Sequence, residues 1–275
     1  MSWLPTGPTL AQLITSLVVV ALGLQVILGC CAYSIWLERR LSAWMQDRVG
    51  PNRVGPQGLL QPLADGLKFF MKEDYTPEGV DRGMFCAAPA MLAIPSLIGF
   101  VIVPWGGALD LSTIAIPGVW NPGWTGTVQI VGANINVGVI YMLAVAGLAV
   151  YGVALGSWAS NSKFAFLGGL RAAAQIISYE IPMGVTLLCA VLMAGSFMPI
   201  EIVAAQQETA WFILQQPVAA VLFYVCMLAE TNRLPFDLAE CESELVGGYH
   251  TEYSSMRFAL FFLAEYFNMI AGAAL

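Results

Sequence analysis

The chain contains 275 residues, of which 58% are hydrophobic and 11% are charged, and its formal net charge is −7. Soluble globular domains carry roughly 25% charged residues, so this composition excludes an ordinary soluble fold and indicates a protein that lies in lipid. Because the apolar runs are continuous and do not alternate with period two, they also exclude a transmembrane β-barrel. We therefore expect an all-α protein.

Six apolar runs have the length that a helix needs to cross a hydrocarbon core, which is roughly 20 residues. We expect a polytopic transmembrane helical bundle that forms a single membrane domain over residues 1–275. The first run lacks the basic region that precedes a signal peptide, so we interpret it as an anchor. The predicted spans are residues 10–36, 84–105, 135–157, 179–198, 211–229 and 258–275.

Basic residues are confined to alternate connections of this bundle. They occur between the first two spans, in the third connection as Lys163 and Arg171, and in the fifth as Arg233. The second and fourth connections contain none. By the positive-inside rule the odd-numbered connections face the cytoplasm, and the N-terminus lies on the outer side of the membrane. The expected location is the inner membrane of a bacterial cell.

The connection after the first span contains two patterns. Residues 50–56 hold two prolines and two glycines, which break a helix and predict a shaped loop. Near Leu60 an interfacial amphipathic helix begins, with Pro62 in its first turn, where a missing N–H costs little. An anchoring role alone does not explain the acids Glu38, Asp47 and Asp65 that lie among the arginines. The apolar face of the helix is formed by Leu59, Leu60, Leu63, Leu67, Phe70 and Met71, opposite Gln61, Asp65, Lys68 and Lys72.

The fifth connection, residues 230–257, is rich in carboxylates. A run of like charge is most often a solvated loop, but we favour a segment that buries apolar side chains and brings carboxylates with them. If residues 237–246 form a helix, Asp237, Glu240, Cys241 and Glu244 share one face and Glu242 points away. Carboxylates in a poorly solvated site titrate as one coupled group. The apolar residues between the acids are Leu234, Phe236, Leu238, Leu245, Val246 and Tyr249.

Three further acids, Glu180, Glu230 and Glu265, lie at or inside the predicted ends of spans. Ionisable groups at membrane depth are functional by default, whereas a side chain at a helix end can simply reach the interface, and both interpretations stay open. His250 is the only histidine, and the six cysteines form no CxxC or Cys/His pair. We therefore expect neither a metal site nor a disulfide framework.

Several motifs together carry a resemblance to one family. They are residues 37–40 (Leu-Glu-Arg-Arg), 47–56, 60–66 with Lys72-Glu73-Asp74, 177–180 (Ile-Ser-Tyr-Glu) and 229–253. With the apolar spans they cover nearly the whole chain, and unrelated transporters are not expected to share them. On these motifs the chain resembles the H subunit of NADH:quinone oxidoreductase, respiratory complex I, which is called subunit 1 in mitochondria.

The resemblance implies a membrane subunit that forms a quinone chamber together with peripheral-arm subunits, which carry the iron–sulfur clusters. The substrate would be ubiquinone or menaquinone. The chain would not be catalytic alone and would bind no cofactor or metal. Its partners in the bilayer would be small membrane subunits and antiporter-like subunits of the same complex. It would not bind nucleic acid.

The resemblance also implies roles for individual residues. The quinone chamber would involve Glu38, Arg39, Asp65, Arg233 and Phe236. The path that couples quinone reduction to proton translocation would contain the carboxylates of Glu180, Glu230, Glu240, Glu242, Glu244 and Glu265.

Two departures from the family pattern and two alternatives accompany this interpretation. The family normally continues with about two further spans beyond residue 275, and many relatives carry an acid in or just before the third span, where this chain has Asn134 and Gly147. One alternative is the anchor subunit of a membrane-bound hydrogenase or formate hydrogenlyase, which is related to the family. The other is a secondary transporter, although no inverted repeat or matched pair of broken helices is evident.

Overall fold

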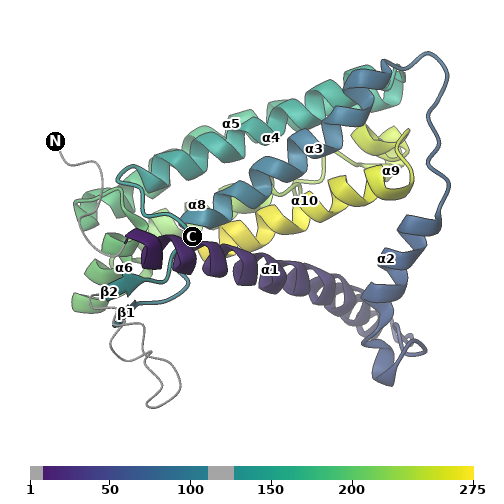
Figure 1. The fold of residues 1–275 in the computed structure, drawn as a ribbon. Coiled ribbons are helices and arrows are strands. Elements are labelled where there is room, and N and C mark those ends of the chain that lie inside the picture. The colour runs from purple at the N-terminus through teal and green to yellow at the C-terminus, as the bar shows by residue number, and fades with distance from the viewer. Residues whose placement is uncertain (1–8, 111–126) are drawn as a thin grey trace.

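A computed structural model describes residues 9–110 and 127–275, which form a bundle of long helices (Figure 1). The two strands form one short antiparallel pair in which Leu109 lies opposite Val128. The helices are α1 (Thr9–Met45), α2 (Gln61–Met71), α3 (Arg82–Ile98), α4 (Gly138–Ala159), α5 (Lys163–Ala194), α6 (Pro199–Glu208), α7 (Phe212–Gln215), α8 (Pro217–Glu230), α9 (Glu242–Leu245) and α10 (Ser255–Ala274). Single 3₁₀ turns are η1 (Pro56–Gly58), η2 (Gly99–Ile102) and η4 (Gly248–His250), and the strands are β1 (Ala108–Asp110) and β2 (Thr127–Gln129).

Within the described residues, four helices are long and apolar enough to cross a membrane, namely α1, α3 with η2, α4 and α5. They confirm the expected all-α membrane fold, and the protein is a multi-pass integral membrane protein. Most apolar side chains of α1 point away from the bundle, as those of Leu17, Leu22 and Val26 do. Such exposure suits a helix whose surroundings are lipid.

The fourth predicted span was wrong in its start. The helix α5 begins at Lys163, so Lys163 and Arg171 belong to the helix and not to a long third connection. Only residues 160–162 separate α4 from α5. The helix also ends earlier than predicted, at Ala194 and not at residue 198, because Gly195 adopts the left-handed conformation (φ 71°) that closes a helix C-terminus.

The fifth predicted span is not one continuous helix. Residues 212–215 form α7, and the fourteen-residue α8 begins anew at Pro217, after the non-helical Gln216. Proline cannot donate the N–H that would continue the preceding helix. The sixth predicted span is helical as α10, and it carries Arg257, Glu265 and Asn268.

The amphipathic helix is confirmed as α2, which begins at Gln61 with Pro62 in its first turn. In Figure 1 it stands apart from the bundle, at the end of α1 and beside the start of α10. The side chains of Leu63, Leu67 and Phe70 on its apolar face are exposed. This face is therefore free to lie in a membrane surface.

The acidic connection differs from the predicted helix over residues 237–246. Only Glu242–Leu245 is helical, so Asp237, Glu240, Cys241 and Glu244 do not share a helical face. The expectation that its apolar residues are buried holds for Leu245 and Tyr249 but not for Leu234, Leu238 and Val246, which are exposed. The segment between α8 and α10, called the acidic loop from here on, consists mainly of turns and is only partly buried.

One buried hydrophobic cluster lies where α3, α4 and α10 meet the acidic loop. The ring of Phe85, fully buried, stacks on Tyr253 with centroids 4.1 Å apart. Glycines on α4 permit this close packing, since a Cβ on Gly152 would lie 2.7 Å from the backbone nitrogen of Leu92 on α3. Small residues at helix contacts are a common means of packing helices in membranes. This core fixes the ends of the helices that carry the ionisable groups.

Candidate functional site

Glu38, near the end of α1, connects three elements at one end of the bundle. Its Oε2 accepts a hydrogen bond from the hydroxyl of Tyr266 on α10 at 2.6 Å, and its Oε1 lies 3.0 Å from Nη1 of Arg233. The Arg233 guanidinium also lies over the Tyr266 ring, 4.7 Å from its centroid. The acidic loop is thus joined to α1 and α10 through one charged group.

Arg39, the next residue on α1, reaches the amphipathic helix. Its Nη1 lies 2.5 Å from Oδ2 of Asp65 on α2, and the side chain of Gln61 donates to the other oxygen of Asp65 at 3.0 Å. Asp65 is largely covered although Arg39 is half-exposed. The side chain of Glu38 therefore links α1 to the acidic loop, and the side chain of Arg39 links α1 to α2.

Phe236 lies in the same loop and is held in place from α5. Its ring packs edge-on against Tyr179 with centroids 5.2 Å apart. Nε2 of the buried Gln175 side chain lies 2.8 Å from the carbonyl oxygens of both Ala229 and Phe236 and 3.0 Å from Oδ1 of Asn232, and its two hydrogens are shared among these acceptors. Neither Gln175 nor Tyr266 was predicted. A glutamine inside an apolar helix was the available sequence signal for the first.

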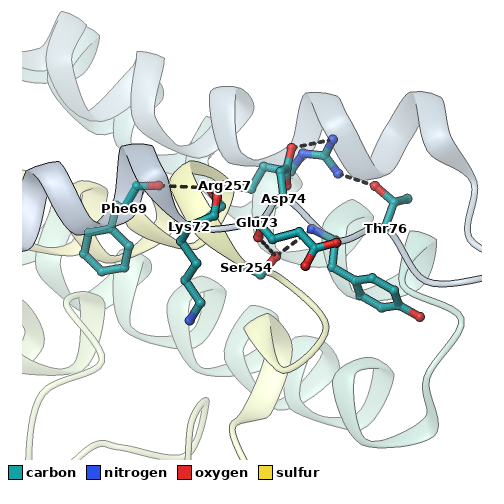
Figure 2. Close-up of polar contacts among 9 residues, drawn as sticks. Phe69, Lys72, Glu73, Asp74, Thr76, Ser254 and Arg257 are labelled. Carbon is teal, nitrogen blue, oxygen red and sulfur yellow. Dashed lines mark hydrogen bonds and ion pairs between the residues drawn. The ribbon is translucent and has the colours of Figure 1, made fainter.

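The start of α10 is tied to the end of α2 by a group of polar contacts (Figure 2). Ser255 Oγ lies 2.9 Å from the carbonyl oxygens of both Phe69 and Lys72, at a helix end whose carbonyls lack partners within the helix. Arg257 forms an ion pair with Asp74 at 3.0 Å and donates to Thr76. These contacts, which the sequence did not predict, fix the helix that carries Asp65 against the helix that carries Glu265.

Glu265 and Glu230 line the same small cavity inside the bundle. Glu265, on α10, is only 8% exposed and interacts electrostatically with Glu240, Arg233, Asp237 and Glu38. Both acids line one internal cavity of about 20 Å³, together with Asn232, Tyr249 and Asn268. A cavity of this size and polarity accommodates a water molecule.

Glu230 also faces away from that cavity. It lines a second internal space of about 50 Å³, with Asn268 and Thr231, between α4, α5, α8 and α10. Its Oε2 is buried and has no hydrogen-bond partner among the described residues. Glu180 on α5 acts on Glu230 electrostatically. Glu230 is therefore linked to Glu265 by a shared cavity and to Glu180 by its charge.

The remaining acids of the predicted path, Glu240, Glu242 and Glu244, belong to the acidic loop. Glu244 is exposed and pairs with Arg171 at 2.6 Å, which lowers the pKa of its carboxyl. Glu240 lies nearer the interior, with Oε1 3.7 Å from Nδ1 of His250. The side chain of Glu242 lies outside the described residues. The structure therefore joins Glu240 to the buried group and leaves Glu244 at its edge.

His250 lies between Tyr249 and Phe258, both of which it contacts edge-on, and its side chain is 15% exposed. Burial lowers its pKa from 6.5 to about 4, so its ring is neutral at pH 7 and its contact with Glu240 is not an ion pair. Burial also raises the pKa of the neighbouring Tyr249 hydroxyl well above its ordinary value, which keeps it a proton donor.

The buried neutral histidine predicts an acid sensitivity. Because the unfolded chain binds a proton near pH 6.5 and the folded chain only near pH 4, stability falls as pH drops through this window. From pH 7 to pH 5 His250 should lower the free energy of unfolding by about 2 kcal/mol. Melting temperatures of the complex at both pH values should therefore differ less in His250→Gln than in the wild type, and equal differences would contradict the assignment.

A bundle of membrane-spanning helices that holds carboxylates and amides in internal cavities, with an interfacial helix tied to one end, defines a class of membrane proteins that handle charge within the bilayer. The sequence profile of the NADH dehydrogenase family matches residues 17–275. The chain belongs to that family.

Three relatives carry a more specific name, H subunit of NADH-quinone oxidoreductase. One from Geobacter metallireducens is 50% identical over 263 residues, which cover 96% of this chain and 76% of that protein. Another, from Geobacter sulfurreducens, is 51% identical, with 91% of this chain and 72% of the relative covered. The protein of Rhodospirillum rubrum is 50% identical, with 88% and 66% covered. The similarity confirms the family expected from the sequence motifs, a membrane subunit of complex I.

Proposed function

We propose that this chain forms part of the quinone chamber of a proton-translocating NADH-quinone oxidoreductase and couples quinone reduction to proton movement through its buried carboxylates. The observation that carries the proposal is the continuous series of ionisable groups from Glu38 through Arg233 and Glu265 to Glu230. It runs from α1 and the acidic loop into the bundle interior. The relatives' names supply the reaction.

The quinone would bind at the end of the bundle where α1, α2 and the acidic loop meet. The exposed apolar face of α2 suits entry of a lipid-soluble molecule from the membrane. Glu38, Arg39, Asp65, Arg233 and Phe236 would form the polar part of the chamber. Electrons would arrive from iron–sulfur clusters of peripheral-arm subunits, and the quinone would be ubiquinone or menaquinone.

The coupling path would consist of Glu240, Glu242, Glu244, Glu265, Glu230 and Glu180. A new charge a few ångströms away, at an effective dielectric constant of about 20, changes the energy of a carboxylate by a few kcal/mol. Moving one charge across 100 mV costs roughly 2.3 kcal/mol. The two energies are comparable, so charge created at the quinone suffices to shift protons along the path toward antiporter-like subunits. In this proposal the acidic loop faces the bacterial cytoplasm and the N-terminus lies on the outer side.

Replacing Glu230 by glutamine tests the proposal. Glutamine keeps the size of the side chain but cannot take up or release a proton, so quinone-linked NADH oxidation by the complete complex should fall several-fold. NADH oxidation by an artificial acceptor, which does not use the quinone chamber, should be unchanged. The matched control is Glu208→Gln, at the exposed end of α6. Equal quinone-linked rates in the Glu230 variant and the wild type would remove Glu230 from the path.

A further inference from the structure

Glu180 is directed from α5 toward the neighbouring helix α4 at Gly147. A Cβ on Gly147 would lie 2.5 Å from Oε1 of Glu180, 3.2 Å from its Cδ and 3.3 Å from its Oε2. The three atoms nearest to that position are thus the three atoms of one carboxylate group. The carboxylate occupies the volume that a side chain at residue 147 would fill.

This contact differs from that of Gly152 on the same helix. A Cβ on Gly152 would meet the backbone of α3, at Leu92 N and Ala88 O, so that glycine serves helix packing. Gly147 has no backbone atom of another helix among its three nearest neighbours. Glycine within a helix costs roughly 1 kcal/mol relative to alanine. Packing of helix against helix therefore does not explain glycine at position 147, whereas room for the carboxylate does.

We propose that Gly147 is a positioning residue, which keeps open the space between α4 and α5 that the Glu180 carboxylate occupies. The inference rests on the proposed function, because it assigns Gly147 to the same coupling path. The end of a glutamate side chain is flexible, whereas the helix backbones are not. A methyl group at position 147 should therefore displace the carboxylate and leave the bundle intact.

Gly147→Ala in the complete complex tests the inference. The amount of assembled complex and NADH oxidation by an artificial acceptor should match the wild type, while quinone-linked proton translocation falls about threefold or more, as for coupled residues in contact. The control is Gly184→Ala, one turn from Glu180 on the same helix. Its Cβ would lie 3.7 Å from Leu143 of α4, an ordinary contact, and translocation should be unchanged.

Rescue separates positioning from general damage. In a chain with Gly147→Ala, the further change Glu180→Asp withdraws the carboxylate by one methylene and should restore part of the lost translocation. In a Glu180→Ala background, Gly147→Ala should cause no further decrease. Additive losses, or no rescue by aspartate, would overturn the inference.

The failure of the inference is distinguishable from the failure of the proposed function. Glu180→Gln tests the path itself, and unchanged translocation in that variant would remove Glu180 from the path. If Glu180→Gln lowers translocation but Gly147→Ala does not, the path stands and the role of Gly147 is refuted.

Discussion

Replacing Gly248 by alanine should destabilise the protein by about 4 kcal/mol or more, in the range of the most damaging single substitutions. Gly248 has a φ of 63°, which L residues rarely adopt, and an added Cβ would lie 1.9 Å from the carbonyl oxygen of Ala239 and 2.8 Å from Cα of Glu240. Both obstacles are backbone atoms of the acidic loop. The loop cannot keep its path around α5 when this residue gains a side chain.

The expected measurement is a lower melting temperature of the complex and less of this chain in the membrane. The neighbouring Gly247→Ala is the matched control, since Gly247 has a φ of −157° and its Cβ would be 3.3 Å from the side-chain oxygen of Thr251. A Gly248→Ala complex that melts at the temperature of the Gly247→Ala complex would show that the loop tolerates a different backbone path.

Local patterns were sufficient to predict the helices whose signals are complete within a few residues. The interfacial helix α2 has both its start signal, Pro62, and its apolar face within eleven residues. The start of α5 was missed because Lys163 and Arg171 interrupt the apolar pattern, although neither residue interrupts a helix. These two charged residues suggested a connection between helices, whereas the backbone continues through both of them as one helix.

The acidic loop could not be predicted from its own sequence, because distant residues determine its shape. Gln175 on α5 binds its backbone carbonyls, and Gly168 of the same helix packs directly on Gly248, where a Cβ would lie 2.8 Å from the backbone. A helical spacing of acids predicts a common face only if the segment is helical, and tertiary contacts here favour turns. The expected grouping of Asp237, Glu240 and Glu244 failed for this reason.

The candidate site depends on contacts between residues that are far apart in the chain. Glu38 and Arg233 are 195 positions apart, so no spacing rule relates them, and their association was expected only from the family resemblance. Tyr266, which binds the same carboxylate, was not expected because a tyrosine in an apolar helix resembles any core aromatic residue. The internal cavity beside Glu230 likewise forms only when α4, α5 and α10 meet.

Replacing Arg233 by methionine should have the largest effect on turnover in the proposed chamber. Arg233 is three-quarters covered and donates to Glu38 at 3.0 Å, and it lies among the charges that act on Glu265. Methionine fills similar space but leaves Glu38 without its cation. Hydrogen bonds to charged groups contribute about 1.5–3 kcal/mol, so quinone-linked NADH oxidation should fall about tenfold or more if the group is needed at the rate-limiting step.

Two further variants distinguish charge from geometry at this position. Arg233→Lys keeps the positive charge but loses the planar fork that lies over the Tyr266 ring, and it should give a rate between those of the wild type and Arg233→Met. Arg82→Met, at the exposed start of α3, removes an equal charge away from the site and should leave the rate unchanged. A lysine variant as slow as the methionine variant would assign the effect to geometry. Wild-type rates in both the methionine and the lysine variant of Arg233 would exclude this residue from the chamber. In the proposal Arg233 lies between the quinone end and the buried acids, so loss of its charge must change the energy of the carboxylates on which it acts.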